Sequence, residues 1–526
     1  MVKGHYDSVD ISLKTSKEIK VYAEKLYIVQ AKVFDIEAGK NIIVLNEQES
    51  REMSIYPGNR VIVKKGDKEA VAIVDVSQSV IARGFVGIFE EVRKAIDIKD
   101  GDLLEIRHMP IPTSIEGIIK KINGAKLSDA ELKAYVRDIV DNKLAEPEIA
   151  AFLVAAQIRG LDDDEIIGLI EGMVSSGGQI SFDSKYVVDK HCIGGVAANR
   201  TTMVVVPIIA AAGALMPKTS SRAITSPAGT ADTMEVLAPV EFSLEELERI
   251  TKKVGGAIVW GGGVNIAPAD DKMIAIRRPL RLDPLGVMMA SILAKKKAVG
   301  SKHLIIDIPI GRGAKVEDIE EGRTMGEKFK TVATRLGINT AVIITDGSEP
   351  IGNGIGPALE ARDVLSVLEG KGPTDLKEKA ILIAGTLLEL CGKAKLGEGI
   401  AMAESILNLG KALKKMKEII EAQGGNPNIK SEDIKIGDVS IDIIAEKDGR
   451  IEHIDNKGIS RIARIAGAPM DKGAGIYLWK AKGDVVKKGD KIMTIYSHNE
   501  ERLTLALKSF ETMSPISMEK LLLTKI

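Results

Sequence analysis

Short apolar runs with β-branched side chains dominate the first hundred residues. NRVIVKK and EAVAIVDV have the composition and length of β-strands, and KKGDKE between them is typical of a turn. This pattern predicts an N-terminal β-rich domain over residues 1–105. The segment contains no motif that carries chemistry.

From residue 114 the apolar positions recur with helical spacing. Ser128 and Glu131 have the spacing of a capping box at the start of the helical run LKAYVRDIVDNK, and PEIAAFLVAAQIRG and DDDEIIGLIEGMVSSG continue the pattern. We predict a small helical domain over residues 114–180, which helices from later in the chain could join.

Residues 185–420 alternate strand-like runs with helical ones. The strand-like runs are KYVVDKH, ALMPK, GAIVWGG, HLIIDIPI and TAVIITDG, and the helix FSLEELERITKKVGG opens with the capping-box residues Ser243 and Glu246. The alternation predicts a large α/β domain with a mixed or largely parallel sheet, which binds ligands at the carboxyl ends of its strands. After the linker AQGGNPN, β-type segments return and predict a C-terminal α+β domain over residues 430–526.

Charge and cysteine content exclude several classes of function. The formal net charge of the 526 residues is −1, whereas nucleic-acid and membrane-surface binders usually carry a one-sided excess. Cys192 and Cys391 form neither a disulfide framework nor a metal-binding pattern. The sequence shows no signal peptide or membrane span. We therefore expect a cytoplasmic protein without a nucleic-acid, membrane or metal partner.

The first stretch with candidate chemistry is DKHCIGGVAANRTT, at residues 189–202. A Gly-Gly turn between a strand and a helix lets backbone N–H groups approach an anion, and Lys190 and Thr201 add donors. An ordinary strand–helix connection would have the same pattern. His191 adjoins the turn, where it is either a structural imidazole or a catalytic, substrate-contacting group.

The second stretch is KTSSRAITSPAGT, at residues 218–230, which is rich in hydroxyls and basic groups and contains no acid. Ser, Thr and Arg side chains bind phosphate by charge-assisted hydrogen bonds. The stretch is either a solvated loop or an anion cradle. The presence of two donor-rich loops, each after a predicted strand, favours the cradle.

Two further segments carry isolated charged groups. Asp283 stands in the basic run RRPLRLDPLG, where it could balance charge, cap the following helix or transfer a proton. Ser291 and Lys295 share one face of that helix, and we expect Lys296 to point to solvent. Lys315 ends the turn GRGAK after a strand, as a substrate contact or as a plain exposed lysine.

These motifs together resemble those of a known family. SSRAITSPAGTADTMEV is similar to the signature of the thymidine/pyrimidine-nucleoside phosphorylases, DKHCIGGV is similar to their phosphate loop DKHSTGGV, and ASILAKK is shared. The residues that match the signature are Ser220, Arg222, Ala223, Gly229, Thr230, Asp232 and Glu235. The similarity extends from about residue 114 to 500.

Within the family, SRAITS and the extra N-terminal domain resemble the archaeal members that act on AMP. The resemblance implies phosphorolysis of AMP, with CMP and UMP as further candidates, to free base and ribose 1,5-bisphosphate. Asp283 would protonate the leaving base, and His191, next to the Gly-Gly turn, is the second candidate catalytic residue. The nucleotide contacts would be Gly195, Ser221, Arg222, Ala223, Ile224, Thr225, Ser226, Thr230, Ser291 and Lys315.

The resemblance also places Lys190, Ser220 and Thr230 near the attacking phosphate, with Thr201 as a further donor. It implies no cofactor, inorganic phosphate as co-substrate, and a homodimer or larger homo-oligomer. Two departures matter: Cys192 stands where the family has a phosphate-contacting serine, and Arg277 and Arg278 fall out of register with the arginine that reads pyrimidines. A thymidine or pyrimidine-nucleoside phosphorylase is the alternative.

Overall fold

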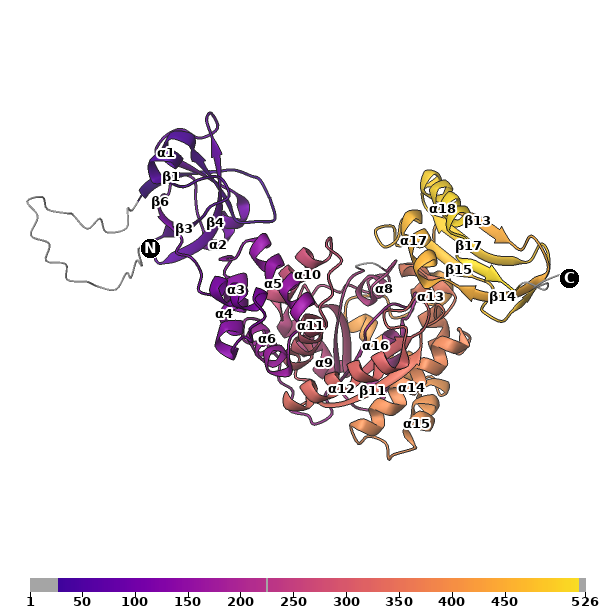
Figure 1. The fold of residues 1–526 in the computed structure, drawn as a ribbon. Helices are drawn as coiled ribbons and strands as arrows, with labels where there is room; N and C mark the ends of the chain where they lie inside the picture. Colours follow the sequence, from indigo (N-terminus) through magenta and orange to yellow (C-terminus); the bar gives the residue numbers. More distant parts are fainter. Residues whose placement is uncertain (1–26, 224–225, 520–526) are drawn as a thin grey trace, which may run out of the picture. The chain divides into compact units, whose positions relative to one another are not determined.

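The computed structural model describes residues 27–223 and 226–519. The chain forms two compact units: residues up to 112 together with 141–144, and residues 113–140 together with 145–526 (Figure 1).

The first unit is a closed six-stranded barrel with the strand order β1-β5-β2-β4-β3-β6. The predicted strands NRVIVKK and EAVAIVDV fall in β3 and β4, which pair antiparallel. Apolar residues of all six strands point inward and form the core. The elements are β1 (Tyr27–Val33), β2 (Ile42–Asn46), α1 (Glu47–Met53), β3 (Arg60–Lys65), β4 (Lys68–Ser77), β5 (Phe85–Ile88), α2 (Glu90–Ile96) and β6 (Leu103–His108).

The second unit begins with a helical layer. The predicted capping box is present, since Ser128 Oγ accepts from Glu131 N at 3.3 Å and Glu131 Oε2 accepts from Ser128 N at 2.7 Å. Two helices from later in the chain, α10 and α11, pack against this layer. The elements are α3 (Ser114–Ile122), α4 (Asp129–Val140), α5 (Glu146–Arg159), α6 (Asp163–Ser175), α10 (Pro268–Arg277) and α11 (Leu285–Ala298).

A parallel sheet follows, and each of its strands lies in one of the predicted runs. β10 pairs in parallel with β11 and β7, β8 pairs in parallel with β9, and a single bridge between Val187 and Leu215 links the two sets. The strands are β7 (Val188–Cys192), β8 (Met216–Ser220), β9 (Gly256–Trp260), β10 (His303–Ile310) and β11 (Asn339–Asp346). Because β7 runs to Cys192, the first four residues of DKHCIGG are strand and only the glycines turn.

Helices pack around this sheet (Figure 1). Buried apolar side chains of the sheet and of these helices form one large core. The predicted second capping box is present at α9, where Ser243 Oγ accepts from Glu246 N at 3.2 Å. These helices are α7 (Thr201–Ala211), α8 (Thr230–Met234), α9 (Leu244–Val254), α12 (Ile319–Arg335), α13 (Pro357–Leu368), α14 (Thr374–Leu390), α15 (Gly399–Asn408) and α16 (Lys411–Ala422).

The last part of the chain is α+β, as its pattern predicts. Its main sheet has the order β12-β15-β17-β13, and β12 belongs to the segment that leads into α13. This pairing attaches the C-terminal part to the α/β core. The elements are β12 (Gly354–Ile355), η1 (Ser431–Asp433), β13 (Val439–Ile444), β14 (Gly449–Ile454), α17 (Asn456–Ala466), β15 (Gly475–Leu478), β16 (Val485–Val486), β17 (Lys491–Ser497), α18 (Glu500–Met513) and β18 (Ile516–Met518).

Two kinds of feature are missing from the described residues. No helix in them is long and apolar enough to cross a membrane. They also contain no group of three or more His, Cys, Asp or Glu side chains that could hold a metal ion.

Candidate active site

The two donor-rich loops follow neighbouring strands and are joined by one buried arginine. Arg200, at the end of the first loop, donates from Nη1 to Thr230 Oγ1 at 2.9 Å and from Nη2 to the Ala228 carbonyl at 2.8 Å, both in the second loop. Its Nε donates to Glu360 on α13, a side chain that is fully buried. Burial raises the pKa of Glu360, although Arg200 opposes the shift. Arg200 therefore fixes the spacing of the two loops.

Beneath the first loop lies the predicted phosphate-binding lysine. Lys190 is 1% exposed, and its Nζ donates to Thr201 Oγ1 at 2.8 Å. Burial lowers its pKa, and the neighbouring Cys192 and Asp307 oppose that effect. Burial also raises the pKa of Cys192 to about 11, so the thiol is neutral at pH 7. Asn199 Nδ2 donates to Cys192 Sγ at 3.3 Å, so the neutral thiol accepts a hydrogen bond from within the first loop.

A buried charged cluster supports the same strand from below. Asp189 accepts from Lys296 Nζ at 2.7 Å and lies 3.1 Å from Lys218 Nζ. The expectation that Lys296 points to solvent is wrong, because its side chain is 3% exposed and pairs with this carboxylate. Desolvation opposes ionisation of Asp189, but the two ammonium groups outweigh it and lower the pKa of the carboxyl.

His191 is a half-buried residue of the same strand, β7. Burial lowers the pKa of the imidazole well below 6.5, and four ammonium groups reinforce the effect: Lys296, Lys218, Lys190 and Lys295. A neutral imidazole can hydrogen-bond substrate oxygens but adds no charge to the site. His191 therefore stays a candidate substrate contact, as a neutral ring.

The second loop presents hydroxyls at the carboxyl end of β8. Ser220 Oγ and Thr219 Oγ1 are buried and have no hydrogen-bond partner among the described residues. An unpartnered buried hydroxyl carries a desolvation cost that a bound anion would remove. Ser226 Oγ donates to the Ala228 carbonyl at 2.9 Å, and Ser221 is exposed. The predicted contacts Ile224 and Thr225 lie outside the described residues.

Arg222 is held by carboxylates. Its guanidinium donates to Glu235 at 2.7 and 2.9 Å, to Glu241 at 2.9 Å and to Asp232 at 3.3 Å, and it lies 5.0 Å from the ring centroid of Trp260. The hydrogen bonds from Arg222 lower the pKa of Glu235 to about 2. These contacts anchor the start of the second loop at Arg222.

The side chain of Asp232 binds two backbone N–H groups of the same loop. One oxygen, Oδ2, accepts from Ala223 N at 2.6 Å and from Gly229 N at 2.8 Å, so the loop is closed at both ends. A Cβ on Gly229 would lie 2.4 Å from the Ser221 carbonyl oxygen, which explains why a glycine is needed there. The Ala223 backbone N–H is therefore already occupied in this structure.

The predicted proton donor faces the α/β domain from the helical layer. Asp283, between α10 and α11, accepts from Arg277 Nη1 at 2.6 Å and pairs through its other oxygen with Lys315 Nζ. The helix that follows has no side-chain cap, so the capping interpretation of Asp283 is not supported. Lys315 is thus a partner of Asp283 and not a plain exposed lysine.

The GRGAK turn also touches the first loop. Gly195 has φ of 92°, and a Cβ there would lie 2.4 Å from the backbone N of Lys315. Only a residue without a side chain allows this approach. Gly195, Lys315 and Asp283 consequently form a continuous chain of contacts from the phosphate loop to the helical layer.

Ser291 and Lys295 share one face of α11, as their spacing predicts. Both donate to Asp270 Oδ2 on α10, each at 2.6 Å. Burial opposes a charged Lys295, but Asp270 and Asp271 outweigh it and raise its pKa. Sequence reasoning missed Asp270, Glu360 and Asp189, since their importance comes from partners 21 to 160 residues away. Asp232, by contrast, could be found from the sequence because it matches the family signature.

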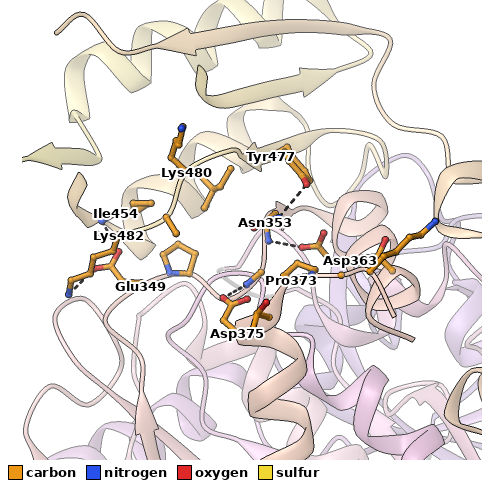
Figure 2. A pocket seen from close by; sticks show the side chains of 17 residues that line it. Glu349, Asn353, Asp363, Pro373, Asp375, Ile454, Tyr477, Lys480 and Lys482 are labelled. Atoms are coloured by element: carbon orange, nitrogen blue, oxygen red, sulfur yellow. Dashed lines mark hydrogen bonds and ion pairs between the residues drawn. The ribbon is translucent and has the colours of Figure 1, made fainter. Parts of the chain in front are cut away.

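A cavity of about 500 Å³ lies apart from these loops, where the α13–α14 turn meets the C-terminal part (Figure 2). Its carboxylates are used by the backbone: Asp363 accepts from Asn353 N and Gly354 N at 2.7 Å, and Asp375 accepts from Gly352 N at 2.8 Å. None of the predicted site residues lines it. The loops at the strand ends, and not this cavity, therefore define the candidate active site.

Comparison with known proteins first defines the class. The chain matches the glycosyl transferase family helical bundle domain over residues 116–177 and its a/b domain over 184–413. Residues 450–517 match the pyrimidine nucleoside phosphorylase C-terminal domain. Among solved structures, anthranilate phosphoribosyltransferase from Thermus thermophilus is similar with a TM-score of 0.50 and 20% identity, over 58% of this chain and 98% of that one, which shows a shared fold. The molecule is a pentosyltransferase of this fold.

Full-length relatives narrow the assignment. The AMP phosphorylase of Thermococcus kodakarensis is 47% identical over 94% of this chain and 98% of its own length. AMP phosphorylase 1 of Archaeoglobus fulgidus is 45% identical over 92% and 96%, and the enzyme of Methanosarcina acetivorans is 47% identical over 94% and 97%. The chain belongs to the AMP phosphorylase family.

Proposed function

We propose that the chain cleaves AMP with inorganic phosphate to adenine and ribose 1,5-bisphosphate. The observation that carries the proposal is the contact chain from Gly195 through Lys315 to Asp283, which joins a phosphate loop to a carboxyl group. The relatives of nearly full length bear the name AMP phosphorylase. The reaction needs two anion sites and one proton donor, and these groups can supply all three.

The attacking phosphate would bind at the first loop. Lys190 and Thr201 are buried together under the Gly-Gly turn, and the Ser220 hydroxyl lies at the end of the adjacent strand without a partner among the described residues. Arg200 holds both loops at fixed spacing. Positioning the phosphate against C1′ is the main contribution expected of them, because aligned reactants lose little further entropy in the transition state.

The nucleotide would bind between the second loop and α11. We assign the 5′-phosphate to the hydroxyls of Ser221, Ser226 and Thr230. Lys315 would leave Asp283 for the nucleotide, and Ser291 would face the base. Each contact is a charge-assisted or neutral hydrogen bond, strong in a site that excludes water.

In the chemical step a phosphate oxygen forms a bond to C1′ while the C1′–N9 bond breaks. The electron pair of that bond goes to the adenine. The carboxylate of Asp283, which is paired with Arg277 and Lys315 at rest, takes up a proton from water once Lys315 has left it and gives that proton to the base. Once Lys315 is drawn to the nucleotide, one oxygen of Asp283 is free to face the base. Arg277, at 2.6 Å, keeps the carboxyl oriented. The neutral His191 is assigned a hydrogen bond to substrate.

A substrate panel tests the proposal. Purified protein is incubated with inorganic phosphate and AMP, CMP, UMP or thymidine, with and without a metal chelator, and ribose 1,5-bisphosphate is identified by phosphorus NMR. We expect release of adenine from AMP at a rate that the chelator does not change. Phosphorolysis of thymidine without cleavage of AMP would instead establish the nucleoside phosphorylase alternative.

A further inference from the structure

A lysine of the C-terminal part pairs with a carboxylate that supports the second loop. Lys472, in the connection between α17 and β15, lies with its Nζ 2.8 Å from Glu235 Oε2. The same carboxylate holds Arg222 through two hydrogen bonds, and Arg222 opens the loop assigned to the nucleotide. One ion-pair chain therefore connects the C-terminal part to that loop.

The charge balance shows what Lys472 adds. Arg222 faces three carboxylates, from Asp232, Glu235 and Glu241, so these four groups together have a net charge of −2. A site for a nucleotide phosphate cannot easily carry such an excess, because like charges repel across a partly dry site. The ammonium of Lys472 reduces the excess to −1 and binds the carboxylate that carries most of the contact with Arg222.

The backbone holds Lys472 in place for this role. Its carbonyl accepts from Ala358 N at 3.0 Å, at the start of α13. A Cβ on Gly356 would lie 2.4 Å from the Ala474 carbonyl oxygen, so the two segments are in direct backbone contact. α13 also carries Glu360, which binds Arg200. The C-terminal part is thus attached to the helix that fixes the loop spacing.

We propose that Lys472 and Glu235 are positioning residues for nucleotide binding, through which the C-terminal part holds Arg222 and the loop that begins with it. The inference rests on the proposed AMP phosphorolysis. Neither side chain is assigned a contact with substrate. Their effect should appear in the affinity for AMP and not in the affinity for inorganic phosphate, which binds at the other loop.

The experiment measures steady-state kinetics of Lys472→Met, Glu235→Gln and the double variant, varying AMP and phosphate separately. Lys472→Met should raise the KM for AMP about fivefold, the upper range for a partly exposed ion pair, with kcat and the KM for phosphate within about twofold of wild type. The double variant should resemble Glu235→Gln alone, because Lys472 acts through that carboxylate. Lys472→Arg should restore the wild-type KM.

Lys508→Met is the matched control. It removes the same charge from an exposed position on α18 of the C-terminal part and should leave every constant unchanged. A Lys472→Met protein with the kinetics of the control would overturn the inference, as would equal losses in kcat and both KM values, which indicate a structural role. A wild-type protein that does not cleave AMP would instead refute the proposed function.

Discussion

Replacing Asp283 by asparagine gives the sharpest test of the assigned chemistry. The substitution keeps the shape of the side chain. It removes the negative charge that Asp283 carries at rest and its ability to take up a proton and pass it to the base. Asp283 is 38% exposed and pairs with Arg277 and Lys315, so the variant also loses two ion pairs. The kinetic and structural consequences can be separated because they differ in size.

The kinetic effect should be large. General acid catalysis contributes about 10²- to 10⁴-fold, equivalent to about 2.7 to 5.4 kcal/mol of transition-state stabilisation. Partly exposed ion pairs contribute about 0.2 to 1 kcal/mol each to folding, so two of them amount to less than about 2 kcal/mol. We expect kcat to fall at least about 10²-fold while the melting temperature falls by only about a few degrees.

The assay is the release of adenine under saturating AMP and phosphate. Asp164→Asn is the matched control, because Asp164 also has two cationic partners, Lys126 at 2.6 Å and Arg335 at 2.7 Å, and lies outside the assigned site. N7-methylated AMP provides a second test, since its base departs without taking up a proton. The loss caused by Asp283→Asn should be far smaller with that substrate.

Two outcomes would refute the reasoning. A kcat within about threefold of wild type would remove Asp283 from the role of acid. An equal loss with AMP and with its N7-methylated analogue would show that Asp283 acts by orienting groups and not by proton transfer.

Glu360→Gln leaves the buried Arg200 without its counter-charge and should lower the free energy of unfolding by about 3 to 5 kcal/mol. The measurement is a denaturant titration, and a loss below about 1 kcal/mol would contradict the bridging role of Arg200. Gly195→Ala places a Cβ 2.4 Å from Lys315 N at a residue whose φ is 92°. The kcat/KM for AMP should therefore fall at least about tenfold, while circular dichroism shows no loss of secondary structure. Unchanged kinetics would refute the close approach. The pKa of His191 lies well below 6.5 in the folded chain, so near pH 6 the imidazole takes up a proton only in the unfolded chain. The contribution of the neutral imidazole to the free energy of unfolding is therefore full above about pH 6.5 and declines as the pH falls. His191→Gln should therefore lessen the fall in melting temperature between about pH 7.5 and about pH 5, and parallel curves would show that the imidazole is not buried in neutral form.

Most of the features predicted correctly from the sequence are helix ends and strands, which depend on residues close together in the chain. The capping boxes at Ser128 and Ser243 are both present, because each depends only on residues three positions apart. The strand runs are confirmed for the same reason: a short β-branched segment in an alternating pattern has few other conformations. Lys296 is the informative error, since its helical neighbours give no hint of the carboxylate, 107 residues earlier, that keeps it buried.

Some residues of the candidate site could likewise be predicted from the sequence, and others could not. The candidate residues Ser220, Thr230 and Asp283 could be picked out from the sequence, because hydroxyl and carboxyl groups at this spacing match a family signature and suit the proposed chemistry. Their supporting partners could not, since a carboxylate such as Glu360 or Asp270 looks like any helical acid until folding places it against a cation.

The sequence by itself determined the order of the elements, the parallel sheet and the loops that follow its strands, because hydrophobic period and turn residues act over a few positions. Only the tertiary structure decided which charges meet. Arg200 joins the two loops, Lys315 pairs with Asp283, and Lys472 reaches Glu235 from the C-terminal part. Such pairs depend on how distant segments pack. In a buried site the interaction energy of a charged side chain, and its tendency to ionise, depend on the charged neighbours that this packing brings within a few ångströms.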